Sequence, residues 1–406
     1  MRNTIGNAKL MKTVNTSIIL DITRKNKHIS RAKIAKISKL NPSTVSNLTG
    51  ELIKVGILKE VGTGISQKGR KPIQLSLNPD GPCMIGVEVI GDRIVALMVN
   101  VEAKIIAKAK IDINTVIDGE VVITKIIKTI HEAIKKSGKG KNEIKGIGMG
   151  ITGLIDPKAG IAKFCPNIGW KNIPIKKLIE EEFEIQTLVD NDVKAMALGE
   201  SWYGSAKGVQ NLICINIGKG LGSGIIINRE IYRGANWIAG EIGHITIDLN
   251  GPRCTCGNRG CLEIFASGGG MVSRALEAIK EGSKTLITQL VSNRLDKITP
   301  KTIFEAADME DKLANEIIKE AGRYLGVAIA NIINTFDPEV VILGGEIVQI
   351  DNFDLMLKSA KRTVFKHVFG GKTRKTEIST TDLGDNSPAI GAATLVVEKL
   401  FNPLSL

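Results

Sequence analysis

Residues 240–263 have the sequence Gly-Glu-Ile-Gly-His-Ile-Thr-Ile-Asp-Leu-Asn-Gly-Pro-Arg-Cys-Thr-Cys-Gly-Asn-Arg-Gly-Cys-Leu-Glu, and the rest of the chain can be interpreted around them. Three of the six cysteines, Cys254, Cys256 and Cys261, fall within eight residues, and His244 lies ten residues before the first. Glycines between them would let a short loop bring the thiolates to one point. Three thiolates and one imidazole are the ligands of a closed, tetrahedral structural zinc site. The spacing therefore predicts Zn²⁺ bound by these four side chains.

Two other interpretations of the cysteines are open. They could be a buried cluster of free thiols, or two of them could form a disulfide. Both fit less well, because a Cys-x-Cys pair strains a disulfide and the chain shows no secretory signal.

Two carboxylates, Glu241 and Glu263, flank the predicted metal ligands. A metal that holds the backbone between them would also set their directions. Carboxylates held in place beside an imidazole suit a polyol, whose hydroxyls donate hydrogen bonds to anionic oxygens. The alternative is that both are solvated surface glutamates.

The composition is that of a multidomain α/β protein. At 406 residues, two or three domains are expected, and 43% hydrophobic residues with 43 glycines suit a packed core with many tight turns. No run of eighteen apolar residues occurs, so we expect no membrane span. Metal-type cysteines and the lack of a signal peptide predict a cytoplasmic location. Cys83, Cys165 and Cys214 stand singly in apolar surroundings and are expected to be inert core residues.

The net charge of +13 is concentrated at the start of the chain. Residues 1–80 hold fifteen Lys and Arg against four Asp and Glu, whereas residues 81–406 hold 40 against 38. A basic head on a nearly neutral body indicates a nucleic-acid-binding module joined to a separate domain. A basic surface without a partner is the alternative.

The head shows three amphipathic helical patterns, at residues 15–25, 31–38 and 42–55. Ser30 is the expected N-cap of the second helix, whose Ile34, Ala35 and Ile37 should face inward. The third helix has Pro42 at its first position. Its expected apolar stripe is Val45, Leu48, Leu52 and Ile53.

This spacing predicts a helix-turn-helix, although Lys39 stands where a turn glycine is usual. Short polar side chains near the start of the third helix would meet base edges in the major groove. The expected DNA contacts there are Ser43, Thr44, Ser46 and Asn47, with Arg31 at the start of the second helix. The same row could be an ordinary solvated face.

Two strand-like runs, residues 57–61 and 73–77, flank a glycine-containing segment and predict a wing. Its tip contains Lys68, Gly69, Arg70 and Lys71. A thin Gly-Arg segment can enter a narrow minor groove, and the other cations would contact phosphates. Residues 78–82, Asn-Pro-Asp-Gly-Pro, then predict a hinge.

The body repeats one plan twice. Strand patterns at 84–89 and 94–99 precede a helix at 119–136 and a strand at 144–151. Strand patterns at 212–217 and 224–227 precede helices at 268–281 and 312–336 and a strand at 340–343. Two similar α/β lobes are therefore expected.

Seven motifs make the chain resemble the ROK family (repressors, open reading frames and sugar kinases), in its regulator branch. They are Gly-Arg-Lys-Pro at 69–72, Gly-Ile-Gly-Met-Gly-Ile-Thr-Gly at 146–153, Pro-Asn-Ile-Gly-Trp at 166–170, Asp-Asn-Asp at 190–192, Tyr-Arg-Gly-Ala-Asn at 232–236, Gly-Glu-Ile-Gly-His at 240–244 and the cysteine motif at 254–263. The resemblance covers essentially the whole length. It implies a winged helix-turn-helix at 1–80, followed by a two-lobed α/β fold of the actin-like sugar-kinase type. Lobe 1 would be 81–205 with a returning C-terminal helix at about 386–406, and lobe 2 would be 206–385 with the zinc loop and a dimerisation surface.

The resemblance also implies a sugar site between the lobes. Its residues would be Gly153, Asn167, Asn191, Asp192, Glu241, His244 and Glu263. His244 would bind zinc through one ring nitrogen and sugar through the other, which the metal restricts to donating. In the family's kinases the residue matching Asp192 is the general base, so here it is a vestigial base candidate.

The first hairpin departs from the kinase pattern Asp-x-Gly-Gly-Thr. This chain has Glu88-Val89-Ile90-Gly91-Asp92, which puts a branched side chain and a negative charge where phosphate should approach. Lys219 in the second turn, where the kinases usually have Thr, is ambiguous.

We therefore predict a sugar-responsive transcriptional repressor without kinase activity. It would bind operator DNA as a homodimer or tetramer and sense a monosaccharide such as xylose or glucose. The alternative is a zinc-containing ROK kinase that transfers phosphate from ATP to a hexose. A zinc-ribbon nucleic-acid module at 240–263 is a weaker third hypothesis, because that segment is not basic.

Overall fold

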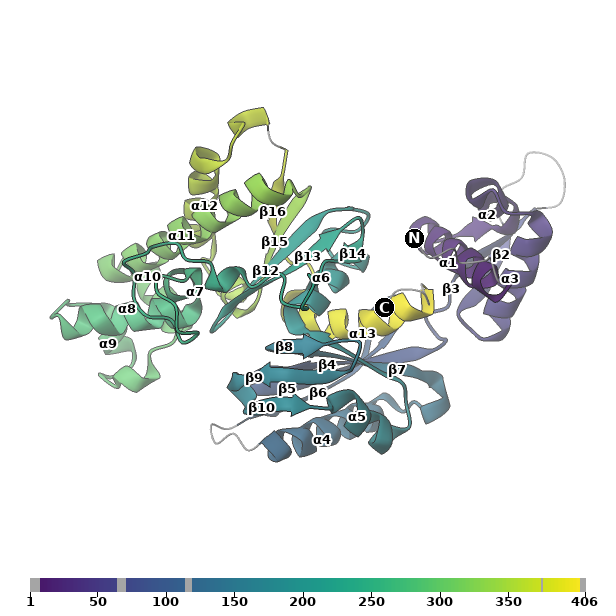
Figure 1. Cartoon of the computed structure of the whole chain (residues 1–406), viewed down its shortest axis with the longest axis horizontal. Helices are drawn as coiled ribbons and strands as arrows, with labels where there is room; N and C mark the ends of the chain where they lie inside the picture. Colours follow the sequence, from purple (N-terminus) through teal and green to yellow (C-terminus); the bar gives the residue numbers. More distant parts are fainter. Residues whose placement is uncertain (1–7, 64–70, 114–118, 374, 402–406) are drawn as a thin grey trace. The chain divides into compact units, whose positions relative to one another are not determined.

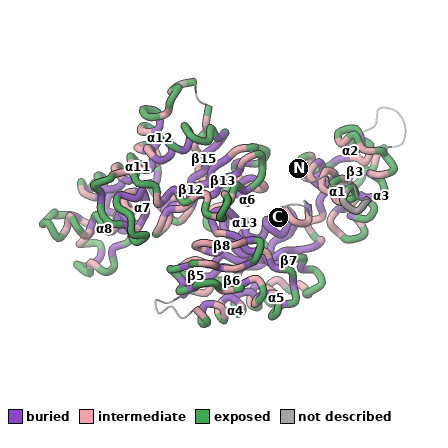
Figure 2. Tube along the Cα trace, in the orientation of Figure 1, coloured by how far each residue is buried: buried purple, intermediate pink, exposed green. Residues whose placement is uncertain are grey.

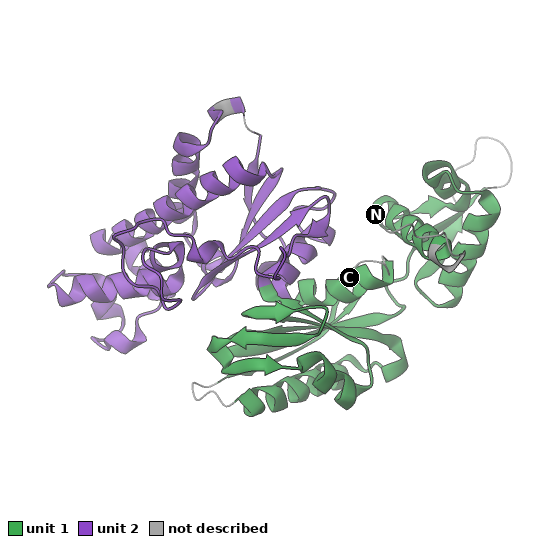
Figure 3. Ribbon diagram, viewed as in Figure 1, with its two compact units in different colours: residues 1–192, 389–406 green, residues 193–388 purple. Residues whose placement is uncertain are grey.

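The computed structural model describes residues 8–63, 71–113, 119–373 and 375–401. The chain divides into two compact units, residues 1–192 with 389–406 and residues 193–388 (Figure 3). Unit 1 contains the basic head and one α/β lobe, and unit 2 is the second lobe. Among the described residues, no helix is both long and apolar enough to cross a bilayer.

The head consists of three helices and a small antiparallel sheet in the order β1-β3-β2 (Figure 1). Its elements are α1 (Ala8–Asn26), β1 (Ile29–Ser30), α2 (Arg31–Ser38), α3 (Pro42–Lys54), β2 (Leu58–Thr63) and β3 (Ile73–Leu77). The predicted bounds of α2 and β3 are confirmed, and α1 is longer than predicted. The predicted N-cap is also confirmed, since the Ser30 hydroxyl accepts a hydrogen bond from the Lys33 amide at 3.3 Å. Lys39 adopts the left-handed conformation (φ 57°) at the turn that lacks a glycine.

The head has its own apolar core. Ile34, Val45 and Leu48 are buried in it as predicted. The prediction for Ile37 was wrong, because its side chain is 48% exposed. Ile34 and Ala35 define the buried face of α2, and a step of about 100° per residue turns Ile37 well away from the middle of that face.

The lobe of unit 1 is built on a five-stranded sheet in the order β11-β7-β4-β5-β6. Its elements are β4 (Cys83–Val89), β5 (Arg93–Asn100), β6 (Ile105–Asp112), α4 (Gly119–Ser137), β7 (Ile144–Ile151), β8 (Leu154–Asp156), β9 (Ile161–Cys165), β10 (Trp170–Ile173), α5 (Ile175–Phe183), β11 (Thr187–Asn191) and α13 (Ser387–Phe401). Helices α4 and α5 cover one face, and α13 covers the other (Figure 1). The approach of α13 is close, because a Cβ added to Gly148 would lie 1.7 Å from the Ala392 carbonyl oxygen.

Unit 2 contains a second five-stranded sheet in the order β14-β13-β12-β15-β16. Its elements are α6 (Asp192–Trp202), β12 (Leu212–Ile217), β13 (Leu221–Ile227), β14 (Glu230–Ile231), α7 (Leu262–Ala266), α8 (Gly268–Lys280), α9 (Leu286–Leu290), α10 (Pro300–Asp308), α11 (Lys312–Phe336), β15 (Val340–Gly344), α12 (Asp354–His367) and β16 (Glu377–Thr380). Helix α6 packs on this sheet, since a Cβ on Gly224 would lie 2.4 Å from the Val193 carbonyl oxygen. The unit boundary therefore falls after residue 192, whereas the predicted lobe boundary was after 205.

The two sheets share one topology. In each, three antiparallel strands (β6-β5-β4 and β14-β13-β12) are followed by two parallel ones (β7-β11 and β15-β16). The central strands of both sheets are buried (Figure 2). The prediction of two similar α/β lobes is therefore confirmed.

Candidate functional site

The four predicted metal ligands come together in unit 2. One ligand atom from each of His244, Cys254, Cys256 and Cys261 lies within 4.8 Å of the others. The His244 Nδ1 is 3.8 Å from the Cys254 sulfur, and the Cys256 and Cys261 sulfurs are 3.7 Å apart. A tetrahedron with Zn–S bonds of about 2.3 Å has edges of about 3.8 Å. The cluster can therefore hold a metal ion, and all six cysteines are free rather than disulfide-bonded.

Tight backbone turns form the segment of residues 244–261 that carries these four side chains, here called the metal loop. The Cys254 amide donates to the Asn258 carbonyl at 2.7 Å, and the Gly257 amide donates to the Cys254 carbonyl at 3.0 Å. Gly260 has φ +62°, and a Cβ there would lie 1.6 Å from the Asp248 carbonyl oxygen. Only glycine fits at this position.

The same loop positions the predicted sugar ligands of unit 2. Cys261 immediately precedes α7, which carries Glu263 in its first turn. The Glu263 carboxylate accepts a hydrogen bond from the Leu221 amide at 2.9 Å, which anchors it to β13. Because the His244 Nδ1 faces the thiolates, its Nε2 points to the other side of the ring. Glu241 is exposed and directly precedes the short 3-10 helix Ile242–His244.

The predicted sugar ligands of unit 1 lie near the ends of β4, β7 and β11. The Asn191 side-chain amide donates to the Gly153 carbonyl at 3.2 Å. Gly153 has φ +108°, and a Cβ there would lie 2.6 Å from the Phe164 carbonyl oxygen. Asn167 is exposed and lies against the β4–β5 turn, because a Cβ added to Gly91 would be 3.3 Å from the Cβ of Asn167. Asp192 is 6% exposed at the start of α6.

Glu88 is a feature of this region that the sequence did not reveal. Glu88 is 3% exposed, and its Oε2 has no hydrogen-bond partner among the described residues. Burial raises the pKa of Glu88 to about 7 against the attraction of Arg93, whose guanidinium is 3.7 Å away. The charges of Asp192 and Asp92 raise that pKa further, so the three carboxylates interact electrostatically.

The three single cysteines are buried, as predicted. Burial raises the pKa of the Cys83, Cys165 and Cys214 thiols, for Cys165 to about 12 with a further contribution from Asp192. Burial therefore disfavours the nucleophilic thiolate form of all three cysteines.

Most of the predicted DNA contacts that the structure describes are exposed. Ser43, Ser46 and Asn47 are exposed on α3, and Thr44 is half-buried. Lys71 is exposed, whereas Lys68, Gly69 and Arg70 lie outside the described residues.

Arg31 has a structural role that its position in the sequence did not indicate. Its Nε donates to the Thr49 hydroxyl at 3.0 Å and its Nη2 donates to Glu60 at 2.9 Å, so it ties α2 to α3 and β2. Arg31 and Lys71 also line one shallow hollow of about 340 Å³.

The doubled sheet and the metal loop define a two-lobed protein of the sugar-kinase type, and the chain belongs to the ROK family, whose model matches residues 84–399. A xylose repressor from Caldicellulosiruptor bescii is 33% identical and is aligned over 98% of this chain and 99% of its own. The crystal structure of a ROK family transcriptional regulator, a homolog of the E. coli MLC protein, superposes with a TM-score of 0.83 at 28% identity, covering 97% of this chain and 98% of that one. A ROK family glucokinase from Streptomyces griseus, in complex with glucose and AMPPNP, gives a TM-score of 0.70 at 31% identity and covers 77% of this chain and 98% of its own.

Proposed function

We propose that this protein is a sugar-responsive transcriptional repressor. One observation carries the proposal: the similarity to repressors includes the head and both units, whereas the similarity to the glucokinase covers 77% of the chain. The basic head is thus what this chain shares with regulators in addition to the sugar-kinase fold.

The head is proposed to be a winged helix-turn-helix that binds operator DNA. The exposed Ser43, Ser46 and Asn47, with Thr44, would contact base edges in the major groove. The wing residues Lys68, Gly69, Arg70 and Lys71 would contact phosphates and the minor groove. Arg31 and Lys71, which line one hollow of the head, are proposed to bind a phosphate there.

The residues proposed to bind the sugar effector are those that match the family's sugar motifs. They are Gly153, Asn167, Asn191 and Asp192 in unit 1, and Glu241, His244 and Glu263 in unit 2. The buried carboxylate of Asp192 and the anchored carboxylate of Glu263 suit hydroxyl donors. The similarity to a xylose repressor makes D-xylose the first sugar to test, with D-glucose next.

The metal is proposed to be a structural Zn²⁺ held by His244, Cys254, Cys256 and Cys261. The ion would cross-link the loop. It would also occupy the Nδ1 atom of His244, so that the ring proton lies on Nε2, which can then donate a hydrogen bond. The hydrogen bond from the Leu221 amide would anchor the Glu263 carboxylate, two residues after the ligand Cys261.

No kinase activity is proposed. A triphosphate near the β4–β5 turn would meet the exposed carboxylate of Asp92, with the buried Glu88 and Asp192 behind it. Burial, and then the charges of Asp192 and Asp92, raise the pKa of Glu88, so this region disfavours added negative charge. One desolvated like charge near a phosphate costs a few kcal/mol, which is roughly a hundredfold or more in binding.

A homodimer is proposed to form through unit 2. Phe336, Phe365 and Phe369 are 39%, 59% and 82% exposed at the neighbouring ends of α11 and α12. Asn334 holds these ends together through the His367 carbonyl and the Phe369 amide. A cluster of exposed aromatic side chains is typical of a protein interface.

The proposal is tested by fluorescence anisotropy of the full-length protein on DNA selected from a random-sequence pool, with and without D-xylose or D-glucose. A sugar-dependent change in the Kd for the selected DNA supports a repressor. Turnover of ATP with either sugar would support the kinase alternative instead.

A further inference from the structure

The segment predicted as a hinge is hydrogen-bonded to the head. The Asn78 amide donates to the Ile57 carbonyl and its side chain donates to the Gly56 carbonyl, both at 2.9 Å. Asp80 pairs with Lys59 at 2.9 Å. A Cβ added to Gly81 would lie 2.1 Å from the Gly56 oxygen, so the segment and the head are in close contact.

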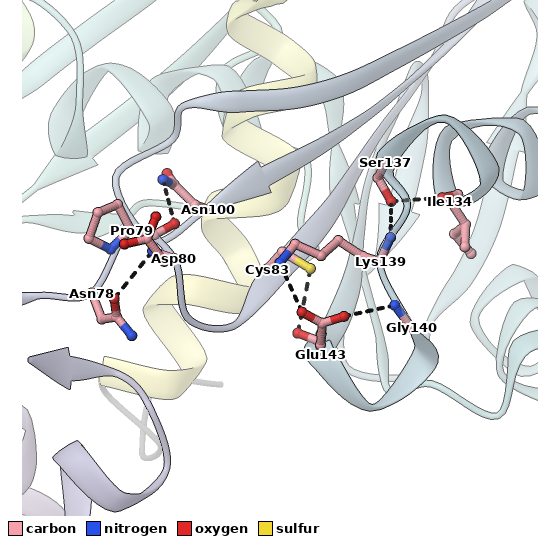
Figure 4. A network of polar contacts seen from close by, with 10 residues as sticks. All are labelled: Asn78, Pro79, Asp80, Cys83, Asn100, Ile134, Ser137, Lys139, Gly140 and Glu143. Atoms are coloured by element: carbon pink, nitrogen blue, oxygen red, sulfur yellow. Dashed lines mark hydrogen bonds and ion pairs between the residues drawn. The ribbon is translucent and has the colours of Figure 1, made fainter.

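The same segment is hydrogen-bonded to the lobe of unit 1 through Asn100 (Figure 4). Its Nδ2 donates to the Pro79 carbonyl at 3.0 Å, and its Oδ1 accepts from the Glu102 and Lys104 amides at 3.0 and 2.9 Å. Asn100 is 2% exposed, so these bonds are shielded from water. The segment is therefore bonded on both sides rather than free to swing.

Asn100 lies at the end of a hairpin whose other end carries candidate sugar contacts. Strands β4 and β5 pair continuously from Cys83 opposite Asn100 to Val89 opposite Ile94. Beyond that last pair, Gly91 lies against Asn167. Seven paired residues at about 3.4 Å each make a connector of roughly 20 Å.

This hairpin is stiff. Every residue of β4 is buried, and β4 is also paired with β7 on its other edge. Buried, doubly paired strands belong to the most stable part of a fold. Such strands move as one body with their sheet, so a displacement of the β4–β5 turn would also displace Asn100.

We propose that Asn100 is a positioning residue that couples sugar binding to DNA binding, by transmitting movement of the β4–β5 hairpin through Pro79 to the head. This inference rests on the proposed function, since it requires both a sugar and an operator. Asn100 is not among the candidate contacts to sugar or to DNA.

The test uses full-length Asn100→Asp. The carboxylate keeps the acceptor for the Glu102 and Lys104 amides but replaces the donor to Pro79 with an oxygen that repels its carbonyl. Ser137→Ala is the matched control, because Ser137 is bonded to the Ile134 carbonyl and the Lys139 amide within the lobe and does not reach the segment. Two quantities are measured: the Kd for D-xylose by calorimetry, and the ratio of DNA Kd values with and without saturating D-xylose.

We expect Asn100→Asp to bring the ratio of DNA Kd values with and without D-xylose at least fivefold closer to one. Its Kd for D-xylose should change less than twofold, and Ser137→Ala should keep the wild-type ratio. An unchanged ratio in Asn100→Asp overturns the inference. If that variant does not fold, Asn78→Asp decides in the same way, because it removes the donor to Gly56 on the head side. A wild-type ratio of one with every sugar tested would instead refute the proposed function.

Discussion

Replacing Cys261 by serine should remove the metal and destabilise unit 2. The Cys261 sulfur is fully buried in the cluster and precedes the helix that carries Glu263. An ion present at a thousand times its Kd stabilises the folded state by about 4 kcal/mol. For a unit of this size, residues 193–388, each kcal/mol shifts Tm by about 2–4 °C, so we expect a loss of about 8–16 °C.

The assay combines metal analysis with calorimetry. Wild-type protein should carry one zinc per chain, and Cys261→Ser should carry less than a tenth of that. Cys83→Ser is the matched control, because Cys83 donates only to the Glu143 carbonyl and a hydroxyl can do the same. Full zinc in Cys261→Ser, or a wild-type protein whose Tm does not respond to a chelator, would refute the metal assignment.

Three further predictions concern electrostatics and ligand contacts. The folded-state pKa of Glu88 is about 7 against an ordinary 4.5, so the folded chain binds more protons than the unfolded chain between these values. Stability should therefore fall by about 3 kcal/mol as pH rises from 4.5 through 7, and Glu88→Gln should abolish this slope in urea titrations at several pH values. Asp192→Asn should weaken sugar binding by about 10- to 100-fold in calorimetry, without changing affinity for DNA in the absence of sugar. Asn47→Ala should weaken binding to the selected DNA by about 5- to 100-fold in anisotropy, while affinity for random DNA stays within twofold.

Regular elements were predictable where one periodicity dominates. The bounds of α2, β3, β7, β12 and α11 were obtained from apolar patterns bounded by glycine, proline or capping residues. The four residues of the candidate metal cluster were also identified from the sequence, because their spacing is local. A motif whose residues are close in sequence can be recognised without knowing which distant residues pack against it.

Features that depend on tertiary contacts were not predictable. Ile37 has the right residue type for a core position but lies on the exposed side of a two-turn helix. The burial of Glu88 and the bond from Asn100 to Pro79 arise from strand pairing between segments distant in sequence. The segment 78–82 has the composition of a hinge, yet hydrogen bonds from both sides hold it.

One preparation of the full-length protein can test whether this chain is a sensor rather than a kinase. Binding to its selected DNA should change at least tenfold when D-xylose or D-glucose is added, and neither sugar should be phosphorylated when ATP and Mg²⁺ are present. This account would be contradicted if a sugar were phosphorylated at an ordinary enzymatic rate of about 1 s⁻¹ or more and no sugar changed the affinity for the selected DNA.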